Sequence, residues 1–318
     1  MNTTQRSVPG LALLGLIACG TEPQQVTFTL QADRFASAEW TEPVNLGPVI
    51  NSAFVDANAS LSPDQHTLYF ISTRPGGFGG NDIWMSQRQC LACPWEEPMN
   101  LGAVINTAAI EVSPSVSDDG QLLFFSSTKA GGFGGADIYV SHRISTSAVG
   151  DVWGDPVNLG PDVNTAAAEQ GSYYVKVSGE ANASVYFNRP GGGGSLDIYK
   201  VFVSNDGVPL GPAVLVPELS DPSGFDQKVA VRTDGHELFL SAIRSGGFGS
   251  FDIYRFTRQS TSDPWSAPEH LDAPINTPDI DSQPSLSRDG KTLIFTSIRP
   301  GGFGVQDLWM STRRPSPQ

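Results

Sequence analysis

Five acidic residues occupy the same position in a repeating pattern, and they are the best candidates for chemistry in this chain. They are Asp56, Glu111, Glu169, Asp226 and Asp281. An Asn or Ser precedes each acid by five residues, or by six in the fourth unit: Asn51, Asn106, Asn164, Ser220 and Asn276. Five carboxylates at one position are expected to encircle one axis, where they would bind a cation such as calcium or an amine-bearing ligand. The structural alternative is that each acid accepts backbone N–H bonds at a strand start and joins neighbouring units.

The elements that must position these acids are copies of one repeated segment. RPGGFGGNDIW at residues 74–84 recurs with small changes at 129–139, 189–199, 244–254 and 299–309. Successive copies are separated by 55, 60, 55 and 55 residues, counted between the aspartates Asp82, Asp137, Asp197, Asp252 and Asp307. A nearly fixed period of this length indicates one supersecondary unit repeated around a ring or along a rod.

Each unit contains four strand-like segments. In the first unit, residues 67–72 form an aromatic and β-branched run, and residues 82–88 alternate apolar and polar positions. Residues 58–62 precede a turn at Pro63-Asp64, and residues 95–102 follow a loop. Four short antiparallel strands in every unit predict the blades of a β-propeller.

The outermost segment predicts how the ring closes. WTEPVNLG (40–47) recurs at 95–102, 153–160, 209–216 and 265–272, with the fourth copy degenerate. The first copy precedes the first inner strand and none follows the last unit, so residues 40–47 are expected to supply the outer strand of the blade built from residues 281–313. This exchange removes an open sheet edge. The predicted fold is all-β, a closed five-bladed β-propeller of four-stranded antiparallel blades, with an open solenoid as the alternative.

Residues 60–84 and 285–309 resemble the bacterial WD40-like β-propeller repeat. The resemblance extends over roughly residues 40–313. It implies a propeller similar to the periplasmic one of the Tol system and to those of many envelope lipoproteins, whose members are mostly binding or assembly modules. The third unit departs from the pattern, because GGGGSLDIY lacks the loop phenylalanine and residues 173–187 lack the Asp-Gly turn.

Two further sets of repeated residues have expected structural roles. A basic residue precedes each repeat aspartate by eight positions and is expected to pair with it across the Gly-rich turn: Arg74, Lys129, Arg189, Arg244 and Arg299. The loop phenylalanines and the aromatic residues that follow them are expected to pack between blades: Phe78, Phe133, Phe248 and Phe303, with Trp84, Tyr139, Tyr199, Tyr254 and Trp309. An exposed ring of these aromatics that stacks on sugars is the alternative.

The N-terminus predicts export and a lipid anchor. Residues 8–18 are an apolar run of signal-peptide length, and Leu16-Ile17-Ala18-Cys19 resembles the lipobox of bacterial lipoproteins. The resemblance implies lipid modification of Cys19 and a location in the cell envelope, tethered to a bacterial membrane. The predicted organisation is a signal peptide at 1–18, a tether at 19–38 and the propeller at 39–318. A soluble exported protein is the alternative.

Cysteine spacing and charge narrow the remaining classes. Cys90 and Cys93 form a lone C-x-x-C without the second pair that zinc needs and outside a thioredoxin-like context, so a local disulfide is expected in an exported protein. The formal net charge of -14 disfavours nucleic acid as a partner. No metal site or cofactor is predicted, and calcium is kept as an alternative for the carboxylate ring.

The leading functional hypothesis is a monomeric, lipid-anchored binding or scaffolding module that recognises an envelope protein or a glycan. A lectin with one sugar site per blade is one alternative. A glycoside hydrolase of the five-bladed type is another, but its acid and base need different environments, whereas these five acids have near-identical sequence settings.

Overall fold

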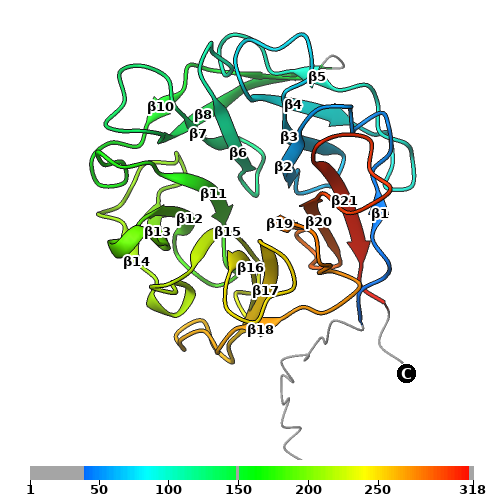
Figure 1. The fold of residues 1–318 in the computed structure, drawn as a ribbon. Coiled ribbons are helices and arrows are strands. Elements are labelled where there is room, and N and C mark those ends of the chain that lie inside the picture. The colour runs from blue at the N-terminus through cyan, green and yellow to red at the C-terminus, as the bar shows by residue number, and fades with distance from the viewer. Residues whose placement is uncertain (1–38, 148–149, 315–318) are drawn as a thin grey trace, which may run out of the picture. The chain divides into compact units, whose positions relative to one another are not determined.

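Each repeat folds into four antiparallel strands, and the five groups of strands encircle a common axis (Figure 1). The computed structural model describes residues 39–147 and 150–314, which belong to the compact unit Arg34–Gln318. The predicted closed five-bladed propeller is confirmed. The predicted signal peptide, the tether and Cys19 lie outside the described residues. Within the described ranges, no helix has the length and apolarity to cross a bilayer.

Counted from the axis outward, the strands of blades 1 to 4 follow chain order, and only blade 5 takes its outer strand from the N-terminal part of the chain. Blade 1 contains β2 (Asp56–Leu61), β3 (Thr67–Ser72), β4 (Asp82–Gln87) and β5 (Met99–Asn100). Blade 2 contains β6 (Glu111–Val116), β7 (Leu122–Ser127), β8 (Asp137–Ser147) and β10 (Val157–Asn158), and β9 (Gly150–Trp153) pairs with β8. Blade 3 contains β11 (Gln170–Val175), β12 (Ala183–Pro190), β13 (Leu196–Val203) and β14 (Val214–Leu215).

Blade 4 contains β15 (Phe225–Val231), β16 (Glu237–Ile243), β17 (Asp252–Thr257) and β18 (Glu269–His270). Blade 5 contains β19 (Asp281–Leu286), β20 (Thr292–Ser297), β21 (Asp307–Thr312) and β1 (Val44–Asn45). One parallel pair, Leu196 with Phe225, links blades 3 and 4 into a single eight-stranded sheet. Short 3₁₀ helices occur at η2 (Gly192–Gly194) and η3 (Pro217–Leu219).

The ring closes as predicted, with the N-terminal strand in the last blade. β1 pairs antiparallel with β21, placing Val44 opposite Met310 and Asn45 opposite Trp309. Trp40 forms a further antiparallel bridge with Arg313. Figure 1 shows β1 beside β21 at the rim, where the first and last described segments meet. Because β21 is paired along this edge, no open sheet edge remains there.

The outer strands are shorter than the sequence predicted. The segment predicted at residues 95–102 contributes only Met99–Asn100 to the ladder. Pro98 directly precedes this pair and has no N–H to donate, so the ladder cannot extend through it. The inner strand of blade 1, by contrast, begins earlier than the sequence predicted, at Asp56 and not at residue 58. The candidate acid is therefore the first residue of its strand.

The core lies between adjacent blades. Every residue of β3 and β7 is buried, because each of these strands is covered on both faces by neighbouring blades. Strands buried on both faces contain continuous apolar runs without alternation, as LYFI in β3 and LLFF in β7 show. Between blades 1 and 2, Tyr69, Phe125 and Trp153 pack in one buried cluster.

An inserted hairpin in blade 2 supplies three of the five extra residues in the single long step of 60, since Asn158 lies 21 residues after Asp137 whereas Asn100 lies 18 after Asp82. The other two lie in blade 3, where Arg189 follows Glu169 by 20 residues and not by 18.

In the inserted hairpin, β8 continues to Ser147 and pairs with β9, which adds a short extension before the outer strand. Asp151 in this hairpin accepts a hydrogen bond from Tyr69 of blade 1 and lies 3.0 Å from the guanidinium of Arg143. The extra residues therefore reinforce the joint between blades 1 and 2.

Candidate functional site

The five candidate acids lie at one end of the axis, which we call the acid mouth because all five inner strands begin there at or beside these residues. Each of the five is 0% exposed. Asp56 shows the common pattern: its Oδ2 accepts hydrogen bonds from Ser52 N at 2.5 Å and Ser52 Oγ at 2.7 Å. Glu111, Glu169 and Asp281 bond in the same way to Thr107, Thr165 and Thr277, and Asp226 accepts from Asp221 N.

Arginines bond to the other carboxylate oxygen of Asp56, Asp226 and Asp281, and in Glu169 an arginine shares Oε1 with the hydroxyl of Thr165. In four blades the basic residue of the repeat pairs with the acid at the strand start: Arg74–Asp56 at 2.6 Å, Arg189–Glu169 at 2.8 Å, Arg244–Asp226 at 2.7 Å and Arg299–Asp281 at 2.5 Å. The sequence prediction that these bases pair with Asp82 and its equivalents was wrong. The register explains why: Asp56 lies opposite Ser72 in the β2–β3 ladder, so Arg74 extends back over the acid.

Blade 2 is the exception within this ring. Lys129 takes the place of arginine, and its Nζ lies 3.9 Å from the centroid of the Tyr139 ring. Glu111 instead accepts a hydrogen bond from Ser127 Oγ at 2.7 Å. Burial lowers the pKa of Lys129, with Glu111 and Asp155 opposing that effect. Among the other acids, burial raises the pKa of Asp226 to about 6, and Arg244 opposes the rise.

These contacts fit the structural alternative to ligand binding, in which each acid accepts hydrogen bonds at the start of its strand. The oxygens of the five acids face backbone amides, hydroxyls and guanidinium groups of their own blade joints, and no solvent reaches them. Ligand binding by these five carboxylates, including binding of calcium, stays a prediction. Within the described ranges, no group of three or more His, Cys, Asp or Glu side chains is arranged to hold a metal ion.

The repeat aspartates fold the Gly-rich turns. Asp82 Oδ2 accepts a hydrogen bond from Phe78 N at 2.5 Å, and Oδ1 accepts one from Gly79 N at 3.2 Å. A Cβ on Gly77 would lie 1.9 Å from Asp82 Oδ2, so glycine is required at this position. The same turn recurs around Asp137, Asp252 and Asp307.

An asparagine in the outer strand supports this turn. Asn100 donates to Asp82 Oδ2 at 3.2 Å, and Asn158 and Asn45 do the same for Asp137 and Asp307. In blade 4, His270 occupies this place, with Nε2 at 3.4 Å from Asp252 Oδ2. No role was expected for His270, although its alignment with the asparagines of the VNLG segment was a usable signal in the sequence.

The loop phenylalanines are on the surface, which corrects the prediction that they pack between blades. Phe78, Phe133, Phe248 and Phe303 are 49%, 50%, 51% and 50% exposed. They lie in the turns before the third strands begin and outside the covered sheet, whereas Trp84, Tyr139, Tyr254 and Trp309 in those strands are buried as predicted. These turns are at the acid-mouth face, since they connect the ends of the second strands to the starts of the third. Blade 3 has Gly192–Gly194 in place of the ring-bearing turn.

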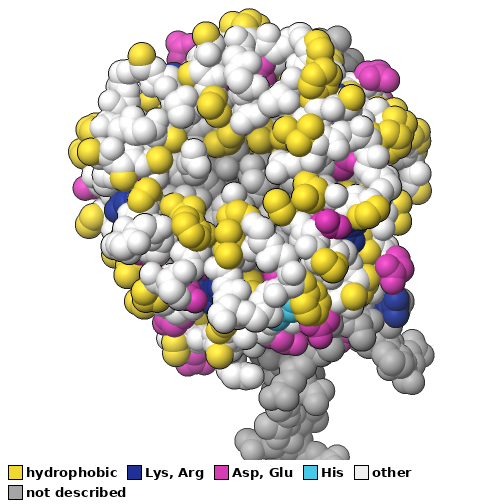
Figure 2. Space-filling view, in the orientation of Figure 1, with side chains coloured by type: hydrophobic (Ala, Val, Ile, Leu, Met, Phe, Trp, Pro, Cys, Tyr) yellow, Lys and Arg dark blue, Asp and Glu magenta, His cyan; other side chains and the backbone are white. Residues whose placement is uncertain are grey.

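A hollow marks the axis on the face shown in Figure 2, and apolar side chains lie around it in separate groups. At the end of the axis opposite the acid mouth, a cavity of about 40 Å³ is lined by residues of all five blades. Among its described lining residues the one carboxylate is Asp118, which pairs with Arg288 at 3.6 Å. Glycoside hydrolysis requires two carboxyl groups, about 5–9.5 Å apart, facing the sugar. The axial cavity does not present such a pair among the described residues.

A groove of about 330 Å³ next to this cavity does contain several acids. Asp64 and Asp119 are occupied by their own turns, where they accept hydrogen bonds from Ser62 and His66 and from Ser117 and Gln121. Asp151 pairs with Arg143. The groove acids are therefore engaged in turns and ion pairs.

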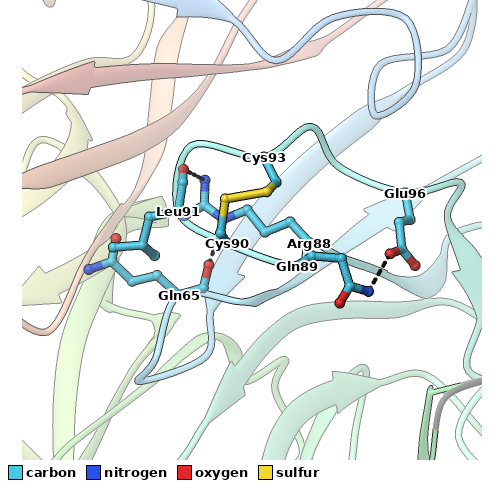
Figure 3. The surroundings of a disulfide bond; sticks show 7 residues. All are labelled: Gln65, Arg88, Gln89, Cys90, Leu91, Cys93 and Glu96. Atoms are coloured by element: carbon cyan, nitrogen blue, oxygen red, sulfur yellow. Dashed lines mark hydrogen bonds between the residues drawn. A yellow bond between two sulfur atoms is a disulfide. The ribbon is translucent and has the colours of Figure 1, made fainter.

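The C-x-x-C pair forms a disulfide in the loop after β4 (Figure 3). Arg88 holds this loop, donating to Gln65 O at 2.8 Å and Leu91 O at 2.9 Å, and Gln89 Nε2 donates to Glu96 Oε1 at 2.8 Å. The loop lies on the side of the ring opposite the acid mouth, because β4 ends there. The disulfide is thus remote from the loop phenylalanines.

Comparison with known proteins identifies the fold but not the activity. No protein-family model and no curated protein matches this chain. A thermostable family-43 glycoside hydrolase superposes with a TM-score of 0.57 at 14% identity, over 86% of this chain and 98% of that one. An α-L-arabinofuranosidase from Lactobacillus brevis superposes with a TM-score of 0.56 at 12% identity, over 84% of this chain and 92% of that one. The catalytic domain of the Coprinopsis cinerea GH62 α-L-arabinofuranosidase superposes with a TM-score of 0.55 at 12% identity, over 88% of this chain and 98% of that one.

These similarities establish the five-bladed propeller fold shared with family-43 and family-62 glycoside hydrolases. At 12–14% identity they carry nothing further about this chain. The finer resemblance to the WD40-like repeat of Tol propellers and the lipoprotein assignment stay predictions.

Proposed function

We propose that this protein is a non-catalytic binding module that docks a glycan on the face carrying the Gly-rich loops. One observation supports this proposal above the others: four phenylalanines at equivalent positions in four blades are half-exposed on one face. Aromatic rings in solvent are available to stack on the apolar faces of sugar rings. Their turns are fixed by the buried aspartates, so the rings are held in place before any ligand arrives.

The repetition of the rings favours a repeating ligand. Four similar weak sites on one rigid ring gain affinity through multivalency when the ligand presents the same unit many times. A polysaccharide has this property, whereas a single folded partner protein does not need four equivalent contacts. The solved structures of the same fold include an exo-β-1,3-galactanase and arabinofuranosidases, which act on glycans. Because those structures share only the fold with this chain, their substrates serve here only to choose the glycans that are tested first.

Glycoside hydrolysis is the second candidate, because the solved structures with this fold are glycoside hydrolases. The electrostatics argue against it. The five candidate acids are fully buried, and four are neutralised by arginines. An acid–base pair needs one protonated and one ionised group facing substrate, and buried ion pairs of this kind cannot reach a sugar.

The test is a binding and hydrolysis screen on the full mature chain. Arabinoxylan, β-1,3-galactan, xyloglucan and peptidoglycan sacculi serve as probes in affinity electrophoresis and sedimentation, with reducing-sugar release measured on the same samples. The proposal expects retention on at least one polymer and no release of sugar. Release of sugar would establish the hydrolase instead. No retention on any probe, together with capture of one envelope protein by crosslinking, would replace the glycan with a protein partner.

The proposed location is the cell envelope, through a lipid on Cys19. Metabolic labelling with an alkyne fatty acid, followed by fractionation of wild type and Cys19→Ser, tests this directly. We expect label and membrane association in the wild type and loss of both in the variant. Unlabelled wild-type protein in the soluble exported fraction would contradict the anchor.

A further inference from the structure

Blade 4 departs from the other blades at two positions of the acid-mouth face. His270 stands where blades 1, 2 and 5 have an asparagine, and Asp272 stands where the same blades have a glycine. In those three blades the glycine N–H donates to the asparagine Oδ1: Gly102 to Asn100, Gly160 to Asn158 and Gly47 to Asn45. In blade 4 the two side chains pair instead, since His270 Nδ1 lies 3.2 Å from Asp272 Oδ1. The two departures are therefore coupled.

The imidazole of His270 also contacts the loop phenylalanine of its own blade. The ring centroids of Phe248 and His270 lie 4.6 Å apart at an interplanar angle of 75°, which is an edge-to-face arrangement. Among the described residues, Phe78, Phe133 and Phe303 have no such ring neighbour. In blade 4, one imidazole thus connects a half-exposed phenyl ring with a carboxylate.

His270 is held in place by three further contacts. The ring of Tyr254 packs against the imidazole, with centroids 5.2 Å apart. Nε2 lies 3.2 Å from Asn276 Nδ2 and 3.4 Å from Asp252 Oδ2. The side chain is only 17% exposed. A side chain fixed in this way positions the groups that it contacts before a ligand arrives, which lowers the ordering cost of binding.

The carboxylate of Asp272 faces solvent beside this cluster. Its side chain is 69% exposed, and among the described residues its one side-chain partner is the imidazole of His270. That contact uses Oδ1, so Oδ2 and the remaining lone pairs are free to accept hydrogen bonds. An exposed ionic contact contributes little to stability. Support of the loop therefore does not account for an acid at this position.

We infer that Phe248 and Asp272 form a sugar subsite selective for two adjacent free hydroxyls, with His270 as the positioning residue between them. A sugar ring stacked on Phe248 extends hydroxyls from its edge, and the carboxylate oxygens accept hydrogen bonds from a neighbouring pair. Such bonds to an ionised acceptor are stronger than neutral ones. Blades 1, 2 and 5 have glycine at this position and supply stacking alone. This inference rests on the proposed glycan-binding function and assigns its selectivity to blade 4.

The linkage of the polymer provides the direct test. The β-1,4-glucan backbone of xyloglucan keeps adjacent hydroxyls at C2 and C3, whereas unbranched β-1,3-galactan has its O3 substituted. In affinity electrophoresis of the full mature chain, Asp272→Asn should weaken xyloglucan binding about tenfold and leave galactan retention unchanged. Asp162→Asn removes another exposed acid, in the corresponding loop of blade 2, and should bind xyloglucan like the wild type.

The outcomes separate this inference from the proposed function. Wild-type affinity of Asp272→Asn for xyloglucan, or an equal loss on both polymers, would overturn the selective subsite while glycan binding stands. Absence of xyloglucan binding in the wild type, with retention of another polymer, would also overturn only the subsite. Failure of the wild type to bind any polymer would remove both.

His270→Asn tests the positioning role. This variant installs the residue of blades 1, 2 and 5, so the turn around Asp252 should keep its support while Phe248 and Asp272 lose their common contact. We expect an unchanged Tm and the same loss of xyloglucan affinity as in Asp272→Asn. Unchanged affinity, or a loss of affinity that accompanies a lowered Tm, would contradict positioning by the histidine.

Nuclear magnetic resonance of the histidine-labelled wild type needs no variant. His66 and His236 directly precede second strands and His142 pairs with Leu122, the first residue of another, so all three lie at the end of the axis opposite the acid mouth. A xyloglucan oligosaccharide should shift the ring signal of His270 and leave the other three in place. An unshifted His270 signal in the presence of bound oligosaccharide would contradict the subsite.

Discussion

The side chain of Asn51 forms two hydrogen bonds with the backbone of Leu308, which is 257 residues away in the chain. Asn106 forms the same two bonds with Ile83, which is only 23 residues away. Asn51 Oδ1 accepts from Leu308 N at 2.8 Å, and Nδ2 donates to Leu308 O at 3.0 Å. For Asn106 and Ile83 the distances are 2.8 and 2.9 Å. The seam between the first and last blades is therefore built like an ordinary joint between consecutive blades. Blade order around the ring, and not chain order, determines these contacts.

This equivalence predicts that the seam and an internal joint are equally sensitive to substitution. Asn51→Ala leaves the buried N–H of Leu308 without a partner, while its C=O keeps the hydrogen bond from Leu46 N, and the loss costs about 1–3 kcal/mol. Asn106→Ala should cost a similar amount, and Asn182→Ala, at an exposed position, should cost little. Urea unfolding of the three variants measures this. A loss for Asn106→Ala without one for Asn51→Ala would show that the ring is open in solution.

The exception in blade 2 gives a second prediction. Arg299 bonds to Asp281 and to the carbonyls of Pro274 and Ile275, so Arg299→Met leaves a buried carboxylate uncompensated. We expect a loss of about 3–5 kcal/mol. Lys129→Met, where the base stacks on Tyr139, should cost about 1 kcal/mol or less. Chemical denaturation measures the loss of stability in both variants. Equal losses would mean that the arginine–acid pairs do not stabilise the joints between blades.

The disulfide loop has a natural control within the chain. Residues 258–265 of blade 4 align with residues 88–95, and Arg258 donates to Gly235 O and Thr261 O as Arg88 donates to Gln65 O and Leu91 O. The turn thus forms without a disulfide. Replacing residues 90–93 by the STSD of blade 4 should preserve the fold and cost at most about 2 kcal/mol, the value for so short a loop. Failure of this variant to fold would contradict that expectation.

Lys228 predicts how stability depends on pH. Its folded pKa is lowered to about 7 by burial, while the unfolded value is near 10.5. Between these values the unfolded chain binds more protons, so the free energy of unfolding should rise with pH from about 7 towards 10, by a few kcal/mol. Asp226, with a pKa of about 6, titrates below this window. Urea unfolding of Lys228→Met should show a flatter profile over the same range, and identical profiles would count against an uncompensated lysine.

The period of the repeat and the placement of the outer-strand segment sufficed to predict the architecture. Because WTEPVNLG at residues 40–47 has no partner in its own unit, closure was the one arrangement that balanced the strands, and β1 pairs with β21 accordingly. The two-residue length of the outer strands was not predictable from the apolar pattern. It follows from prolines that interrupt the ladder.

Contacts between side chains were harder to predict, because several spacings repeat together. Arg74 lies eight residues before Asp82 but also 18 after Asp56, and nearly the same two spacings recur in the other units. Only the register of β2 against β3 shows that the second spacing is the one that forms an ion pair. The exposure of Phe78 did have a signal in the sequence, since a residue between glycines in a turn lacks a sheet to cover it. Lys228 also stood out, as the one ionisable residue at its position among the five units.

The central claim is that the loop phenylalanines bind the ligand, and titration of Phe→Ala variants with the retained polysaccharide tests it most directly. Phe78, Phe133, Phe248 and Phe303 should each contribute about 1 kcal/mol, so each single variant weakens binding roughly fivefold and the fourfold variant abolishes it. Phe202→Ala removes a 43%-exposed phenylalanine outside these loops and should bind like the wild type. Undiminished binding by a folded fourfold variant would contradict the account.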